Sequence, residues 1–233
     1  TVPEHPVTSK GALLIVGGPQ YRVGSHRQFV LLSRYLAKRG IPSIRFDYRG
    51  MGDSSGSERS FEEIDDDVRA AIDFFFESVP AVDQVILWGL CDGASAACFY
   101  APQDTRVAGL VLLNPWVRTE SGEARTYLKY YYLRRLFEPD FWKKLWGRQV
   151  AISASARNIA RSLRMARSSP GAGNSDGNAD LPTRRALAAT RARLPILFIL
   201  SGNDYVANEF DDVCEKHQIW SRLTSEATLI RLE

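Results

Sequence analysis

The stretch Gln84-Val-Ile-Leu-Trp-Gly-Leu-Cys-Asp-Gly93 constrains the fold of this chain more than any other. An apolar, partly β-branched run meets a glycine-flanked turn, and a helix-forming run from Ala94 to Tyr100 follows. This order predicts a buried strand, a tight turn and a helix. Such a turn holds its central residue in a strained backbone conformation above the sheet edge. The flanking glycines are required because a Cβ at either position would collide with the neighbouring strand or helix.

The residue at the centre of this turn is Cys91. A helix N-terminus beneath its sulfur would favour the thiolate, which is the nucleophilic form of cysteine. We therefore predict that Cys91 is a catalytic nucleophile. The alternative is a buried, inert cysteine, which is the usual fate of a free thiol.

Apolar runs and amphipathic runs alternate along most of the chain. Strands are predicted at 12–16, 43–47, 85–88, 109–113, 195–200 and 228–232, and helices at about 25–39, 60–78, 94–100 and 209–223. Ser60 and Glu63 have the spacing of a capping box at the start of the second helix. Continuous apolar strands between helices imply an α/β fold with a doubly wound, mostly parallel sheet covered on both faces.

This alternation breaks between 116 and 167, where the pattern is helical, rich in aromatic residues, and carries 12 Lys and Arg against 4 Asp and Glu. The following segment, 168–183, has the composition of a linker. We therefore predict a core formed by 1–115 and 184–233, with a helical lid and flexible linker inserted at 116–183. The basic side chains of the lid would face solvent or contact an anionic substrate group.

Composition narrows the class of protein. The 233 residues are 45% hydrophobic and 24% charged, with a net charge of +3, which is ordinary for a soluble globular protein. No apolar run approaches the roughly 18 residues of a transmembrane helix. The three cysteines show no metal-ligand or redox-pair spacing, and their odd number suits a reducing cytoplasm. We expect no metal, no cofactor and no nucleic-acid partner, although peripheral contact with a membrane is open.

A cysteine nucleophile requires an acid and a base. Asp204 follows the strand predicted at 195–200, and functional groups in doubly wound sheets gather at such strand ends. We predict that Asp204 is the catalytic acid, the alternative being a turn aspartate that binds local backbone groups. Where the catalytic residues occur along the chain in the order nucleophile, acid, histidine, the histidine is the base and follows the last strand. Here that histidine would lie beyond Glu233. His26 is the fallback, with an exposed helix-start residue as its alternative.

An oxyanion hole needs two backbone N–H groups. We predict the amide of Asp92 as the first and an amide of the Gly17–Gln20 loop as the second, with Gln20 preferred to Gly18. Arg22 and His26, together with the neighbouring Arg27, are placed near the same loop and are possible substrate-binding residues. Their alternative is solvated surface charge.

The loop Asp47-Tyr-Arg-Gly-Met-Gly-Asp53 is predicted to be structural rather than catalytic. Its glycines would form turns, and Arg49 and Asp47 would pair with each other or bind backbone groups. Contact with a substrate is the less favoured interpretation of this loop.

Several of these motifs resemble a known superfamily. Gly89-Leu-Cys-Asp-Gly93, the loop Phe46–Ser54 and Ser201-Gly-Asn-Asp204 resemble the α/β hydrolases. More narrowly, the segments 17–27, 89–97 and 113–118 resemble the exosortase A system-associated hydrolase 1 family, which is bacterial. The resemblance implies a cysteine nucleophile with Asp204 as its acid. It also implies that opening strands precede Thr1 and that a histidine follows Glu233, but it supplies no substrate.

The leading function is therefore a cytoplasmic cysteine-dependent acyl hydrolase. A thiolate would attack an ester, thioester or lactone of a small molecule or of an acyl carrier, and form an acyl-cysteine. An acyltransferase of the same fold is an alternative. A second alternative is a non-catalytic binding module that acts through its basic, aromatic lid on an anionic membrane surface or a polysaccharide-assembly complex.

Overall fold

The computed structural model describes residues 1–17, 21–57, 59–115, 117, 181–202 and 204–233. The chain divides into two compact units, one formed by Thr1–Val117 with Thr183–Glu233 and the other by Arg118–Pro182. The predicted lid and linker at 116–183 therefore lie almost entirely outside the described residues.

The first unit is built on a six-stranded sheet with the order β2-β1-β3-β4-β5-β6. Its strands are β1 (Lys10–Ile15), β2 (Ser43–Arg45), β3 (Gln84–Leu90), β4 (Val107–Leu113), β5 (Ile196–Ser201) and β6 (Thr228–Leu232). Every neighbouring pair in this sheet runs parallel. The predicted doubly wound, mostly parallel sheet is confirmed.

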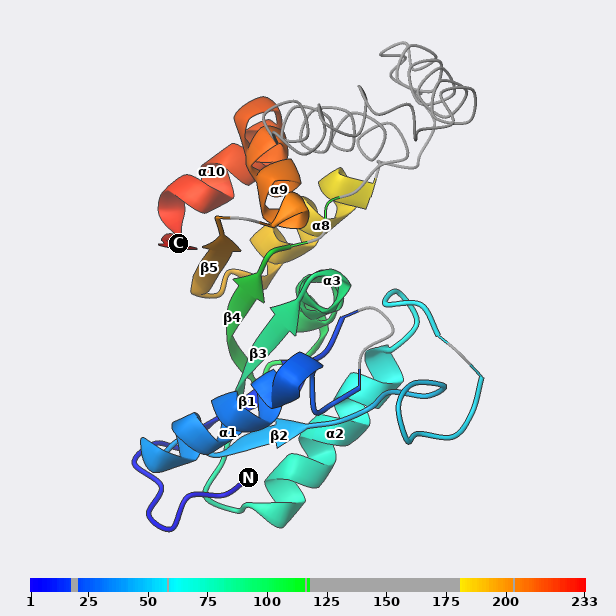
Figure 1. Ribbon diagram of the computed structural model, residues 1–233, viewed down its shortest axis with the longest axis vertical. Coiled ribbons are helices and arrows are strands. Elements are labelled where there is room, and N and C mark those ends of the chain that lie inside the picture. Colours follow the sequence, from blue (N-terminus) through cyan, green and yellow to red (C-terminus); the bar gives the residue numbers. More distant parts are fainter. Residues whose placement is uncertain (18–20, 58, 116, 118–180, 203) are drawn as a thin grey trace, which may run out of the picture. The chain divides into compact units, whose positions relative to one another are not determined.

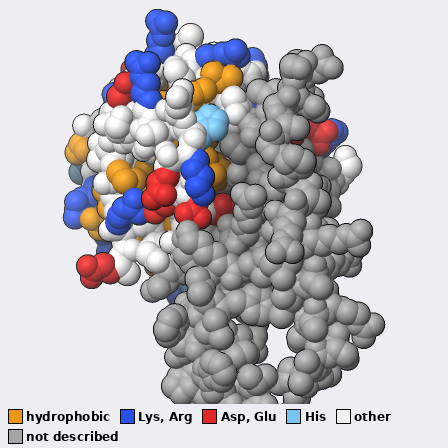
Figure 2. All heavy atoms as spheres, turned by 90° about the horizontal axis from the view of Figure 1, so that it is seen from above, with side chains coloured by type: hydrophobic (Ala, Val, Ile, Leu, Met, Phe, Trp, Pro, Cys, Tyr) orange, Lys and Arg blue, Asp and Glu red, His pale blue; other side chains and the backbone are white. Residues whose placement is uncertain are grey.

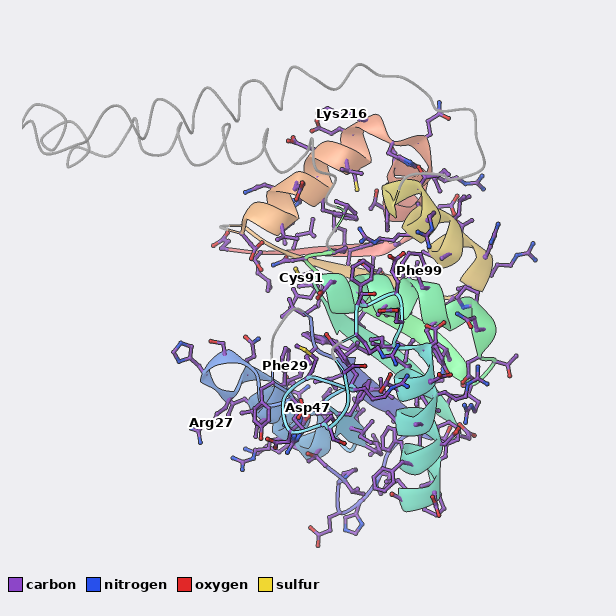
Figure 3. The ribbon with its side chains drawn as sticks, turned by 90° about the vertical axis from the view of Figure 1, so that its right-hand side faces the viewer. Arg27, Phe29, Asp47, Cys91, Phe99 and Lys216 are labelled. Carbon is purple, nitrogen blue, oxygen red and sulfur yellow. The ribbon has the colours of Figure 1, made fainter. Side chains whose placement is uncertain are left out.

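Helices connect these strands and cover the sheet. They are η1 (Ser25–Arg27), α1 (Gln28–Lys38), α2 (Asp65–Ser78), α3 (Asp92–Tyr100), η2 (Ala101–Gln103), α8 (Leu181–Ala192), α9 (Tyr205–Lys216) and α10 (Gln218–Glu226). Helix α1 lies on one face of the sheet, and α2 and α3 lie on the other (Figures 1 and 3). Among the described residues, no helix combines the length and apolar character needed to cross a membrane.

The central strands carry the core because both of their faces are covered. Leu13 and Leu14 of β1, Leu87 of β3 and Leu112 of β4 have no exposed surface. This burial explains why these strands read as continuous apolar runs in the sequence. Because the strand ends are fixed by this core, the loops that follow them start from defined positions.

A cluster of three aromatic rings packs on β5. The rings of Phe210 and Trp220 lie 5.2 Å apart, and Phe198 of β5 lies 5.4 Å from Phe210 and 6.3 Å from Trp220. The predicted single helix at 209–223 is wrong, since His217 has extended backbone angles and separates α9 from α10. The break allows Phe210 and Trp220, on two different helices, to pack on the same strand.

Two helices also differ from the sequence prediction. The capping-box pair forms, because the backbone N–H of Ser60 donates to Glu63 Oε2 at 3.2 Å, but α2 begins only at Asp65. The buried Ile64 occupies the N-cap position of α2, so the Ser60 turn precedes the helix rather than opening it. Helix α8 was not predicted, and its first residues were assigned to the linker.

The visible surface of the first unit mixes both signs of charge. Figure 2 shows Lys, Arg, Asp and Glu side chains interspersed on the described part of one face. The basic excess predicted from the sequence belongs to 116–167, which lie outside the described residues except for Val117.

Candidate active site

The nucleophile candidate lies at the junction of β3 and α3. Cys91 follows the last residue of β3 and is the N-cap of α3, with φ 59° and ψ −117°. These angles are strained for a residue with a Cβ, and they turn the chain sharply from strand into helix. Figure 3 shows Cys91 at this turn. The strand, turn and helix predicted from the sequence are therefore present.

The glycines on both sides of Cys91 make this turn possible. A Cβ on Gly89 would lie 2.5 Å from the Cα of Ala94, and a Cβ on Gly93 would lie 2.5 Å from the carbonyl oxygen of Ile15. Both obstacles are backbone atoms, which cannot swing aside as a flexible side chain can. The first turn of α3 therefore packs directly on β3 and β1, as the sequence motif predicted.

The three thiols have different surroundings. Cys91 is half-buried, whereas Cys98 lies inside α3 and is buried. Burial raises the pKa of the Cys98 thiol to about 12, and burial also raises that of Cys214 to about 12. Only Cys91 lies at a helix N-terminus, where the helix dipole favours a thiolate.

Gly17, just after β1, touches the Gly89–Gly93 turn, which we call the elbow. A Cβ on Gly17 would lie 2.1 Å from the carbonyl oxygen of Leu90 and 2.3 Å from Oδ1 of Asp92. The start of the predicted oxyanion loop is thus in contact with the residue whose amide we expect as the first oxyanion donor. The second predicted donor, Gln20 or Gly18, lies outside the described residues.

The acid candidate lies two strands away. Asp204 follows β5 and is the N-cap of α9, where its Oδ1 accepts hydrogen bonds from the backbone N–H groups of Val206 at 2.7 Å and Ala207 at 3.3 Å. This is the capping role that the sequence left open as the alternative. Among the described residues, these capping hydrogen bonds engage Oδ1 alone, which leaves Oδ2 available to orient a histidine.

The sheet brings the ends of β3 and β5 to the same level. Leu113 at the end of β4 pairs with Leu90 on one side and with Ile199 on the other. Cys91 and the Ser201–Asp204 loop therefore emerge from one edge of the sheet, separated by two strand spacings of about 10 Å. That separation suits a nucleophile and an acid with a histidine between them.

The residues predicted near the β1 loop have other partners. Arg22 forms ion pairs with Asp47 and, at 2.9 Å, with Asp53, and the hydrogen bond to Asp47 is the main reason its pKa is raised. His26 and Arg27 are exposed and have left-handed backbone angles within η1. Substrate binding by Arg22 or His26 stays a prediction, and for Arg22 it would compete with two carboxylates.

The loop around Asp47 has a structural role, although one predicted pair is wrong. Asp47 accepts hydrogen bonds from the backbone N–H groups of Arg22 at 2.6 Å and Asp53 at 3.2 Å. Arg49 instead forms a bidentate pair with Asp67 in the first turn of α2. Asp47 thus binds backbone as predicted, and Arg49 ties this loop to a helix rather than to Asp47.

The described histidines lie in positions other than the one predicted for the catalytic base. Nε2 of His217 lies 2.9 Å from the hydroxyl oxygen of Thr183, which links the α9–α10 junction to α8. His26 lies in η1 at the surface. The predicted base after the last strand, beyond Glu233, is not among the described residues.

A family model described as serine aminopeptidase S33, within the Hydrolase_4 group, matches residues 8–170. The match covers more than half of the chain and includes the whole elbow. The chain belongs to this hydrolase family. The description names a serine peptidase, whereas the elbow of this hydrolase carries Cys91.

Among curated proteins, the hydrolase is similar to the polyketide transferase GrgF of a Penicillium species. The two are 28% identical over 127 residues, which cover 52% of this chain and 42% of that protein. The aligned region thus spans less than half the length of this relative.

Solved structures agree on the fold. An esterase of Pyrococcus furiosus gives a TM-score of 0.61 at 13% identity, with 97% of this chain and 73% of that chain covered. GrgF from Penicillium gives 0.58 at 17% identity, covering 98% and 82%. Est1E of Butyrivibrio proteoclasticus, solved with ferulic acid, gives 0.58 at 16% identity, covering 100% and 83%. At such low identities these likenesses show the α/β-hydrolase fold alone.

Two residues of the site region were missed by sequence reasoning. Asn114, which follows β4, has φ 43° and bonds to Ser201 at the start of the acid loop. Its local signals were the Asn-Pro pair after an apolar run and its place in the motif at 113–118, but neither assigned it a role. Arg185 of α8 is 1% exposed and had no sequence signal, because α8 itself was not predicted.

Proposed function

We propose that this α/β hydrolase is an acyl hydrolase that uses Cys91 as its nucleophile. The observation that carries the proposal is the backbone of Cys91, which is held at φ 59° and ψ −117° between β3 and α3. This strained turn presents a half-buried thiol at the N-terminus of a helix. Strain of this kind is retained where it serves a function.

In the proposed reaction, the Cys91 thiolate attacks the carbonyl carbon of an ester, thioester or lactone. The negative oxygen of the tetrahedral intermediate accepts hydrogen bonds from the amide of Asp92 and from an amide of the Gly17–Gln20 loop, Gln20 in preference to Gly18. The C–O or C–S bond then breaks, and the leaving group takes the proton that the base removed from the thiol. An acyl-cysteine remains.

Water completes the reaction by attacking the acyl-cysteine after giving a proton to the base. The carboxylic acid leaves and the thiolate is restored. We expect the base to be a histidine after β6, oriented by Asp204, with His26 as the fallback. The capping bonds to Val206 and Ala207 fix one oxygen of Asp204, so the direction of the other oxygen is defined.

Transfer of the acyl group to an alcohol or another acceptor is a second candidate. It is supported by the similarity to a protein named as a polyketide transferase, at 28% identity over part of the chain. Hydrolysis and transfer share the acyl-cysteine and differ only in the group that resolves it. We also propose, from motif resemblance, a bacterial role in an exosortase system. The cytoplasmic placement follows from the odd number of cysteines, and the helical lid at 116–183 from the sequence pattern of that segment.

Acylation of Cys91 tests the proposal directly. The full-length protein is mixed with p-nitrophenyl acetate, and the acetyl group is located by mass spectrometry of peptides. We expect acetylation at Cys91, none in Cys91→Ala, and unchanged acetylation in the matched variant Cys214→Ala. Replacement of Asp204 by Asn should slow turnover by about 100-fold or more.

The fate of the acyl group separates the candidates. Release as acetate supports hydrolysis, and faster loss to an added alcohol supports transfer. If Cys91 in the full-length protein is not acylated, the enzymatic proposal is overturned and the non-catalytic binding module is favoured.

A further inference from the structure

Asn114 connects two loops that sequence reasoning treated separately. It follows the last residue of β4, is 5% exposed, and has the left-handed backbone angle φ 43°. Its side chain points to Ser201 at the end of β5: Oδ1 accepts the Ser201 backbone N–H at 2.9 Å, and Nδ2 donates to the Ser201 hydroxyl at 3.0 Å. We name this pair of bonds the Asn114–Ser201 bridge.

The left-handed backbone of Asn114 lets the chain turn away from β4 while the residue still bonds to β5. Asparagine tolerates this conformation better than most residues with a Cβ. The backbone N–H of Asn114 still donates to the carbonyl oxygen of Ile199 at 2.9 Å, so the β4–β5 ladder continues into this residue. The side chain extends the same ladder by one further bond after the strand has turned away.

The neighbouring residue holds the nucleophile. The backbone N–H of Cys91 donates to the carbonyl oxygen of Leu113 at 3.0 Å. Leu113 and Asn114 are consecutive, so one dipeptide at the end of β4 contacts the elbow on one side and the acid loop on the other. The end of β4 therefore helps to fix the position of the elbow and of the acid loop relative to each other.

The acid loop is short and is fixed at both ends. The carbonyl oxygen of Ser201 accepts the N–H of Asp204 at 3.3 Å, and the N–H of Gly202 donates to the carbonyl oxygen of Leu232 in β6 at 2.8 Å. Asp204 then caps α9. Because only two residues separate Ser201 from Asp204, a displacement of Ser201 is transmitted to the carboxylate.

We propose that Asn114 is a positioning residue, which places the Ser201–Asp204 loop, and with it the Asp204 carboxylate, relative to Cys91. The inference rests on the proposed function for its catalytic consequence, since Asn114 would touch neither substrate nor the reacting atoms. A small error in the position of catalytic groups is costly, so the bridge matters more for turnover than for stability.

The variant Asn114→Gly isolates the bridge. Glycine adopts a φ of 43° without strain, so this change removes the side chain and keeps the backbone. Amide hydrogen exchange in the full-length protein, followed by NMR, reports on the bridge without any need for activity. We expect the Ser201 amide to exchange at least tenfold faster in the variant, with the Cys91 amide unchanged as the internal control. Unchanged exchange at Ser201 overturns the bridge.

A double-mutant cycle tests the catalytic consequence. With p-nitrophenyl acetate, Asn114→Gly should lower kcat by about 100-fold with little change in KM, because geometry is lost and no substrate contact is removed. In an Asp204→Ala background the same change should alter kcat less than twofold, since its effect passes through Asp204. A loss of equal factor in both backgrounds overturns the positioning role and indicates general destabilisation.

The two proposals fail differently. If Cys91 of the full-length protein is not acylated, or if Asp204→Ala leaves turnover unchanged, the proposed function is overturned and the catalytic part of this inference falls with it. If acylation and the Asp204 effect are present while Asn114→Gly behaves as the wild type, only the role of Asn114 is overturned.

Discussion

A Cβ on Gly17 would lie 2.3 Å from Oδ1 of Asp92, so the loop after β1 rests on the side chain next to the nucleophile. The same Cβ would lie 2.1 Å from the carbonyl oxygen of Leu90 and 3.2 Å from the Cβ of Cys91. Three successive residues, Leu90, Cys91 and Asp92, thus pack closely around Gly17. Gly17, the first residue of the predicted oxyanion loop, is therefore packed against the elbow.

Replacing Gly17 by alanine should disturb its packing against the elbow. The new Cβ meets a backbone oxygen that cannot give way, so we expect a loss of about 1–3 kcal/mol in the free energy of unfolding. Turnover of an activated ester should fall at least tenfold, because the oxyanion donors move. Urea denaturation and steady-state kinetics measure the two effects. Gly109→Ala is the matched control, since its Cβ would lie no closer than 3.4 Å to any atom beyond its two chain neighbours. Equal effects from both changes would contradict the prediction.

Thiol reactivity should single out Cys91 in the folded protein. Burial raises the pKa of Cys98 and of Cys214 to about 12, so at pH 8 both thiols are almost entirely protonated. We expect iodoacetamide to modify Cys91 first at pH 8 and all three thiols in denaturant, as followed by peptide mass spectrometry. In Cys91→Ala the folded protein should stay unmodified on the same timescale. Modification of Cys98 before Cys91 would be incompatible with the proposed nucleophile.

The elbow could be predicted from sequence because its determinants are contiguous. Gly89, Cys91 and Gly93 lie within five residues, and the strand and helix around them have strong local patterns. Helix α8 was missed because its second residue is proline and its core-facing residues include the small Ala186 and Ala189. Proline is well tolerated in a first helical turn, but after a linker-like segment it reads as a breaker. Alanine gives a weak periodic signal.

Contacts between distant residues could not be predicted in the same way. Asn114 and Ser201 are 87 residues apart, and only the adjacency of β4 and β5 in the sheet brings them together. The partners of Arg22 and Arg49 depend likewise on where β2 ends and where α2 begins. Local sequence showed that charged groups were present in these loops, but the choice of partner belongs to the tertiary fold.

Acid should weaken a partly buried ion pair between η2 and β4. Asp104 accepts a bidentate pair of hydrogen bonds from Arg106, at 2.9 and 2.7 Å, and another from the Tyr100 hydroxyl at 2.7 Å. The bonds from Arg106 are the main cause of a pKa well below the usual value for Asp104. Its stabilising contribution is therefore complete above about pH 4, where an unfolded aspartate is ionised, and is lost as the pH falls toward the folded pKa.

The variant Asp104→Asn checks this sign. At pH 7 it should lower the free energy of unfolding by about 2 kcal/mol, because charged hydrogen bonds become neutral ones. At pH 2–3 the difference from the wild type should shrink, since the wild type loses its own contribution there. Urea denaturation at both pH values gives the comparison, with the exposed Asp83→Asn as control. A difference that grows on acidification would show that the direction of the shift is wrong.

Two adjacent arginines in α8 should differ sharply in importance. Arg184 is half exposed, pairs with Glu62 at 3.0 Å and lies 5.5 Å above the ring of Phe99. Arg185 is 1% exposed and lies 5.0 Å above the ring of Phe61, which stacks on Phe99 at 6.4 Å. Burial lowers the pKa of Arg185 to about 10, which is still high enough to keep the charge at neutral pH.

Arg185→Ala should therefore cost about 3 kcal/mol in the free energy of unfolding, because it leaves a cavity at a buried site and removes the contact of the guanidinium with the Phe61 ring. Arg184→Ala should cost less than about 1 kcal/mol, as exposed ion pairs contribute little. Urea denaturation of both variants at pH 7 decides between them. Since Asp92 adjoins Cys91 and its charge attracts that of Arg185, Arg185→Ala should also slow acylation in the protein that remains folded, while Arg184→Ala leaves it unchanged. Equal stability losses for the two arginines would mean that α8 is held mainly by its exposed contacts.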